Sequence, residues 1–279
     1  MPAERIAESL AFINWTVLTG LAIGSFGAVA VGHLRTGASR GYLAFTGLVA
    51  VLLGLLAVAS DGGLPRVTAT GSPISIDAVW DPARRTAMLV FCGLAFASDV
   101  AILRRFRAPL LAAAAVAAGL TVLALAALSW GGGPIGVVSL ALQLVALSAA
   151  LGGAWASMIL GHWYLVTPKL PEAPLVLFAR TLAIVVAAQV GLFVVWLGLG
   201  AGPAGQPAFG ALAGASALFV WLRLIVGLVF PLVISWAALK TAQTRSMESA
   251  TGLLYIDVAA IAASTIVAAG LYFGAGLLV

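Results

Sequence analysis

The sequence contains two histidines, and each stands at the end of a long apolar run. His33 ends the run that begins near residue 11, and His162 ends the run that begins near residue 135. Two neutral imidazoles at similar depths in a membrane can supply both axial ligands of a low-spin b-type haem. We therefore expect His33 and His162 to be candidate ligands of one haem iron, with cations nearby to neutralise the propionates: Arg35, Arg40, Lys169 and Arg180.

Other interpretations of the same histidines remain open. Imidazoles at a membrane border can cap helix ends and fix depth beside aromatic residues such as Trp163 and Tyr164. They can also contact a proton pathway or a quinone, whose headgroup needs donors beside an apolar channel for its tail. The polar segment 241–255 offers such groups in Gln243, Ser249, Thr251 and Tyr255, although Ser249 or Thr251 can equally cap the last helix.

Three further ionisable residues, Asp99, Arg223 and Asp257, fall inside apolar runs. A charged side chain at membrane depth is costly and needs a partner or a function. One interpretation is that Arg223 forms a buried ion pair with Asp99 or Asp257. The other is that these residues together form a proton relay or an anion-binding site. Pro231 lies two turns beyond Arg223 and should loosen the helix there.

The composition fixes the class of protein that carries these residues. Of the 279 residues, 63% are hydrophobic and only 8% are charged, whereas soluble domains have about 25% charged residues. A water-soluble globule is therefore excluded, and the sequence predicts an all-α, polytopic membrane protein. The single cysteine, Cys92, argues against an iron–sulfur cluster, and the formal charge of +5 is spread over short loops rather than forming a nucleic-acid surface.

Eight runs are long enough to cross the hydrocarbon as helices: 11–33, 42–60, 86–103, 109–130, 135–162, 175–200, 210–238 and 252–278. The loops on the two sides of the membrane differ in charge. One side carries Arg35, Arg40, Arg104, Arg105, Arg107, Lys169, Arg180, Lys240 and Arg245, and the other carries Arg5, Arg66, Arg84 and Arg85. The positive-inside rule then predicts a bacterial-type plasma membrane protein whose more basic side faces the cytoplasm and whose termini lie outside.

The two histidines also lie on a weak internal repeat. At an offset of 129, residues 24–33 resemble residues 153–162, with glycines, an aromatic residue and the histidine matching. Four spans separate the copies, so the sequence predicts a tandem 4+4 repeat with halves 1–130 and 131–279. Gly20, Gly24, Gly27 and Gly32 follow one another along the first run, where they can either allow close helix packing or make room for a flat cofactor.

These features favour an electron-transfer subunit of a respiratory-type or photosynthetic complex that binds haem b, a quinone or both near the cytoplasmic face. The sequence has no hydrolytic or nucleotide-binding motif, so any enzymatic role is that of a redox subunit. Partner subunits would dock on loop 61–85 or on the cytoplasmic loops. The alternatives are a secondary transporter or channel-like protein using Arg223, Asp99 and Asp257, and a structural anchor without a cofactor.

Overall fold

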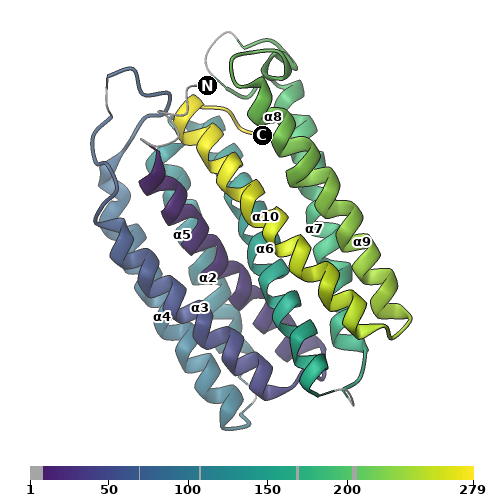
Figure 1. Cartoon of the computed structure of the whole chain (residues 1–279). Helices are drawn as coiled ribbons and strands as arrows, with labels where there is room; N and C mark the ends of the chain where they lie inside the picture. The colour runs from purple at the N-terminus through teal and green to yellow at the C-terminus, as the bar shows by residue number, and fades with distance from the viewer. Residues whose placement is uncertain (1–8, 69, 107, 168–169, 203–205) are drawn as a thin grey trace.

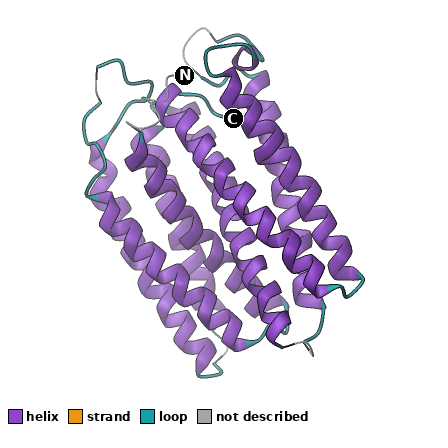
Figure 2. Ribbon diagram, viewed as in Figure 1, coloured by secondary structure: helices purple, strands orange, loops and turns teal. Residues whose placement is uncertain are grey.

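The computed structural model describes residues 9–68, 70–106, 108–167, 170–202 and 206–279, and over these residues the chain is helical with no strand (Figure 2). Eight helical segments are long and apolar enough to cross a membrane. The predicted all-α membrane fold and the number of spans are confirmed. The spans are α2 (Leu10–Arg35), α3 (Arg40–Asp61), α4 (Asp81–Leu103), α5 (Pro109–Trp130), α6 (Pro134–Val166), α7 (Ala173–Gly198), a composite seventh span, and α10 (Met247–Ala275).

The seventh span changes its helical type halfway along. It consists of α8 (Ala217–Leu224), a π-helical turn η3 (Ile225–Val229) and α9 (Phe230–Gln243). Proline has no N–H to donate, so Pro231 leaves the carbonyl of Gly227 without its usual helical partner. The hydroxyl of Ser264 on α10 donates to that carbonyl at 2.7 Å. The predicted loosening is therefore present, and it lies in the turn immediately before the proline.

Two helix starts differ from the predictions. The third span begins at Asp81, five residues earlier than expected, because Pro82 in its first turn is well suited to a helix start. The predicted cap of the last span is wrong. Its N-cap is Ser246, so Ser249 and Thr251 lie inside α10, where the Thr251 hydroxyl donates to the carbonyl of Met247.

α2 and α6 cross closely in the middle of the bundle, and α10 packs on both of them. On one side of α10 lie α3 and α4, and on the other side lie α7, α8 and α9 (Figure 1). The crossing depends on glycine. A Cβ atom on Gly24 would lie 1.8 Å from the carbonyl oxygen of Ser148, and one on Gly152 would lie 2.2 Å from the backbone nitrogen of Ser25. Small residues allow such an approach where lipid supplies no hydrophobic drive. At Gly24 the packing interpretation of the glycines is thus confirmed.

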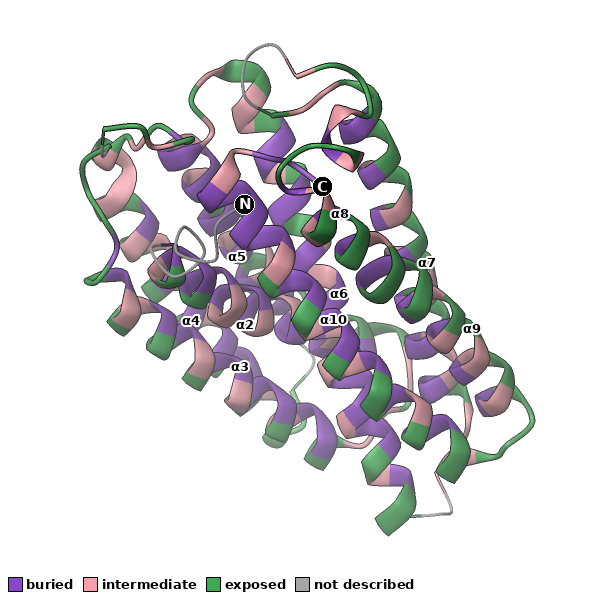
Figure 3. Ribbon diagram, turned by 45° about the horizontal axis from the view of Figure 1, so that its top comes forward, coloured by how far each residue is buried: buried purple, intermediate pink, exposed green. Residues whose placement is uncertain are grey.

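The two ends of the bundle differ in the residues they carry. α2 begins and α10 ends at the same end (Figure 1). We call the opposite end the basic end, because Arg35, Arg40, Arg104 and Arg105 gather there and are exposed. Arg5, Arg107 and Lys169 lie outside the described residues. Exposed side chains follow the outward faces of the helices, and many are large and apolar, as a lipid-facing surface requires (Figure 3). The 4+4 repeat and its two halves stay predictions.

Candidate functional site

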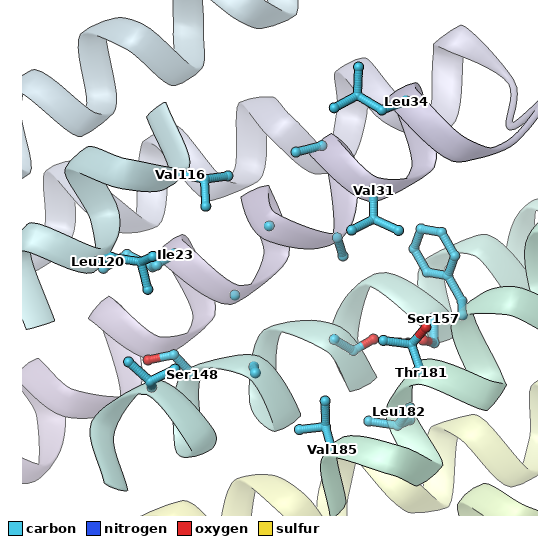
Figure 4. Close-up of a pocket in the computed structure, with 18 of the residues that line it drawn as sticks. Ile23, Val31, Leu34, Val116, Leu120, Ser148, Ser157, Thr181, Leu182 and Val185 are labelled. Atoms are coloured by element: carbon cyan, nitrogen blue, oxygen red, sulfur yellow. The ribbon is translucent and has the colours of Figure 1, made fainter. Parts of the chain in front are cut away.

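An apolar groove runs along α2 from the middle of the bundle to the basic end (Figure 4). Four helices line it: α2 and α5 from the first predicted half, and α6 and α7 from the second. On α2 it extends from Ile23 to Arg35, which is about 18 Å at the helical rise of about 1.5 Å per residue. Its volume is about 680 Å³, within the range of about 300–1,000 Å³ typical of small-molecule sites.

Three of the lining residues are glycines, and two of them, Gly27 and Gly153, face open space. A Cβ atom on Gly27 would meet nothing within 4 Å, and one on Gly153 would meet only Leu182, at 3.9 Å. The hydroxyls of Ser157 and Thr181 donate to carbonyls of their own helices, at 2.7 and 2.9 Å. The wall therefore offers an apolar tail few free polar groups. Gly27 opens space and does not bring backbones together, while room for a flat cofactor stays a prediction.

The groove ends at the basic end beside two potential hydrogen-bond donors. Arg35 lines the groove and also a second cavity of about 700 Å³, which His33 borders. That cavity is completed by residues 34, 36 and 37, by Pro109 at the start of α5, and by Ala173 and Leu177 at the start of α7. Arg35 is exposed and His33 is partly buried. The apolar groove thus ends at the Arg35 guanidinium, and the second cavity, which shares Leu34 and Arg35 with it, is bordered by the His33 imidazole.

His162 lies elsewhere. Its Nδ1 atom is 3.3 Å from the hydroxyl of Tyr255 on α10, and its side chain is exposed. His33 instead faces a cavity formed with α5 and α7. A haem held by both histidines needs the two imidazoles to face one iron atom. Their different neighbours do not fit such a shared haem, so we derive no chemistry through one.

The other predicted binding residues do not converge on the groove. Gln243 is exposed at the end of α9, Tyr255 contacts His162, and Thr251 is buried against Gly161 of α6. Arg40 is the first residue of α3, and Arg180 is exposed on α7 next to Thr181, which lines the groove. Of the cations proposed for the propionates and described by the structure, only Arg35 borders the groove itself.

Arg223 is 2% exposed and has three hydrogen-bond partners among the described residues. It donates to Ser264, to the side-chain oxygen of Gln189 at 3.5 Å and to the main-chain oxygen of Val279 at 3.4 Å. Within the described part of the chain neither Asp99 nor Asp257 forms an ion pair with it. Asp257 is instead fully buried and accepts a hydrogen bond from Ser235 of α9 at 2.6 Å. The structure therefore does not bring Arg223, Asp99 and Asp257 together.

A buried charge cluster lies at the end opposite the basic end, and the sequence interpretation treated its members only as loop charges. Asp61, the last residue of α3, accepts hydrogen bonds from Arg84 and Arg85 in the first turns of α4. Arg84 also pairs with Asp81 at 2.9 Å, and its guanidinium lies 4.7 Å from the ring centroid of Trp130. Opposite charges at the two ends of one loop are the signal that would have predicted this cluster.

Comparison with known proteins gives no family for the chain, since no family model, no curated protein and no solved structure matches it.

Proposed function

We propose that this chain is the membrane subunit of an electron-transfer complex and that it binds a prenylated quinone in the groove between α2, α5, α6 and α7. The observation that carries the proposal is an apolar channel that ends at Arg35, beside a cavity that His33 borders. A quinone has a long apolar tail and a headgroup with two carbonyl oxygens, so the two ends of the site match the two ends of the ligand.

The shape of the groove supports a ligand with a single tail. It is one channel about 18 Å long, which is more than half of the hydrocarbon thickness of about 30 Å. Of the three lining hydroxyls in the described part of the chain, those of Ser157 and Thr181 are engaged within their own helices and only that of Ser148 is not, so an isoprenoid chain meets mostly apolar walls. Gly27 leaves room for the methyl branches of such a chain.

The polar end supports recognition of carbonyl oxygens. The Arg35 guanidinium is a permanent multiple donor, and the His33 imidazole can donate a hydrogen bond and pass on a proton. Reduction of a quinone takes up two electrons and two protons. In this proposal the partner subunits supply the electrons, and the chain supplies the depth, the donors and access to protons at the basic end.

The same proposal includes the location of the protein. The basic end would face the cytoplasm of a bacterial-type cell, because basic residues are retained on that side of plasma membrane proteins. Partner subunits would dock on the basic-end loops or on loop 61–85. A quinone would then be bound near the inner leaflet.

A photoreactive azidoquinone with a single prenyl tail tests the proposal on the full chain in bilayer nanodiscs. We expect cross-links on peptides of α2 and α7, and about tenfold less cross-linking in Gly27→Phe, since the ring would fill the groove. Gly93→Phe on α4 is the matched control, because Gly93 also has nothing within 4 Å but does not line the groove. Equal cross-linking in the two variants would contradict the proposal.

A second candidate is a secondary transporter, which is favoured by the π-helical turn that interrupts the seventh span beside Arg223. Interrupted spans are frequent in transporter binding sites. Solute flux into liposomes tests it: a transporter that uses this turn loses flux in Arg223→Leu while remaining folded. Absence of both flux and quinone cross-linking would leave the structural anchor.

A further inference from the structure

α3 and α4 pack as an antiparallel pair with glycines at the points of closest approach. Gly54 abuts Cys92, and Gly47 abuts Asp99. A Cβ atom on Gly47 would lie 2.0 and 2.4 Å from the two carboxyl oxygens of Asp99. Asp99 is only 4% exposed. Its carboxyl group is therefore enclosed between two helices, pressed against the backbone of α3.

Neither oxygen of this carboxyl group has a hydrogen-bond partner within the described part of the chain. No cation there lies within ion-pair distance of it either, and Arg104 and Arg105, one turn further along, are exposed. Asp61 differs because two arginines hold it, and Asp257 differs in part because Ser235 donates to one of its oxygens while the other has no partner among the described residues. Asp99 is thus a buried acid that the fold leaves without a counter-charge.

The neighbouring helices offer few other titratable groups. α5, which packs on α4, has none in its sequence. α3 contributes Arg40 at its exposed first residue, Asp61 at its opposite end, and Tyr42, whose hydroxyl donates to the carbonyl of Ala156 on α6. α4 itself carries Asp81, Arg84 and Arg85 in its first turns, far from Asp99, and the buried Cys92 two turns away.

An unpaired carboxylate in such surroundings is far more costly than a neutral carboxylic acid. A bound metal ion would need several oxygen, nitrogen or sulfur ligands, and the described residues contain no group of three or more histidine, cysteine, aspartate or glutamate side chains that could hold one. A proton needs no other ligand. We propose that Asp99 is a proton-binding site, occupied in the resting protein, that exchanges with the aqueous phase at the basic end.

The position of Asp99 makes this exchange feasible. α4 ends at Leu103, four residues later, which is about 6 Å along the helix axis. The next residues, Arg104 and Arg105, are exposed, so water reaches within about one turn of the carboxyl group. Asp99 does not line the groove, and the proposal therefore does not rest on quinone binding.

Infrared spectroscopy of the full chain in lipid bilayers tests the site directly. We expect a carbonyl stretch of a protonated carboxylic acid that moves when aspartate is labelled with ¹³C at its side-chain carboxyl carbon and when H₂O is replaced by D₂O. Asp99→Asn, whose amide is nearly isosteric with the carboxyl group beside Gly47, should abolish the part of this band that Asp99 contributes. Asp257→Asn should retain it.

Two results would overturn the proposal. One is a wild-type spectrum in which ¹³C-aspartate moves no band of a protonated acid, a measurement that needs no variant to fold. The other is a protonated-aspartate band that is the same in Asp99→Asn as in the wild type, since a weaker residual band can come from Asp257, which also has an oxygen without a partner among the described residues. A band that moves with ¹³C but not in D₂O would contradict exchange with the aqueous phase.

Discussion

Asp61 and Arg84 form a buried ion pair at 3.0 Å that joins the end of α3 to the start of α4. Both side chains are almost fully enclosed, with 3% and 1% of their surfaces exposed. Arg85 pairs with the other oxygen of Asp61 at 2.7 Å, and Ser129 of α5 accepts a hydrogen bond from Arg84 at 2.7 Å. The cluster therefore connects three helices at the end where loop 61–85 leaves the bundle.

Removing one partner of this pair should destabilise the protein strongly. We expect Arg84→Met to lower the free energy of unfolding by about 3–5 kcal/mol, because it leaves Asp61 buried with only Arg85 as a partner. Arg245→Met provides the control: its pair with Glu172 is exposed, so the loss should be below about 1 kcal/mol. Denaturant unfolding in mixed micelles measures both. Equal losses would mean that the buried cluster has no special role.

Arg35 and Arg180 allow a matched test of the polar end of the groove. Both are exposed arginines on helices that line it, but only Arg35 borders the groove. We expect Arg35→Gln to weaken quinone binding in nanodiscs about tenfold, which corresponds to one hydrogen bond from a charged donor. Arg180→Gln should leave the affinity unchanged. If both substitutions weaken binding equally, a general surface charge and not a headgroup contact would be responsible.

His33 and His162 should behave as independent residues. His33→Ala should weaken quinone binding about fivefold, the usual worth of one neutral hydrogen bond, while His162→Ala should not change it. An absorption spectrum of the dithionite-reduced protein is the decisive companion measurement. A Soret band that each substitution alone abolishes would show that the two imidazoles share a haem, and would contradict the inference drawn from their different neighbours.

The helices were predictable from sequence because each span carries its own signal of length and hydropathy. Which way a side chain faces depends on packing that no single span encodes. Gly24 and Gly27 are three residues apart on α2, yet the first forms the contact with α6 and the second opens the groove. In the same way, His33 and His162 both lie in the last turns of their helices but face different neighbours. The partners of Arg223 were not predictable because they are distant in sequence and none is an Asp or Glu side chain.

The crossing of α2 and α6 should tolerate no added methyl group. Gly152→Ala would place its Cβ atom 2.2 Å from the backbone of Ser25, so the helices must separate. We expect a loss of about 1–3 kcal/mol in stability, as for other overpacked interiors. Gly191→Ala on α7 is the control: it meets nothing within 4 Å, and alanine favours helices over glycine by about 1 kcal/mol. A stable Gly152→Ala protein in thermal unfolding would refute the close crossing.

Ser264 should couple Arg223 to the π-helical turn. Its hydroxyl donates to the carbonyl of Gly227 and accepts from the Arg223 guanidinium, so Ser264→Ala leaves two buried groups each short of a partner. We expect a loss of about 1–3 kcal/mol in the free energy of unfolding for each group left unsatisfied.

A substitution of the neighbouring Thr265 is the control for simple loss of a buried hydroxyl group. Thr265 is equally buried, but its hydroxyl donates only to the carbonyl of Ile261 in its own helix, so Thr265→Val should cost much less. Combining Ser264→Ala with Arg223→Leu then tests the contact itself. If the two residues interact, the double variant loses less stability than the sum of the single variants, because the second substitution removes a contact that the first has already broken. Strict additivity would mean that Ser264 acts on the turn alone.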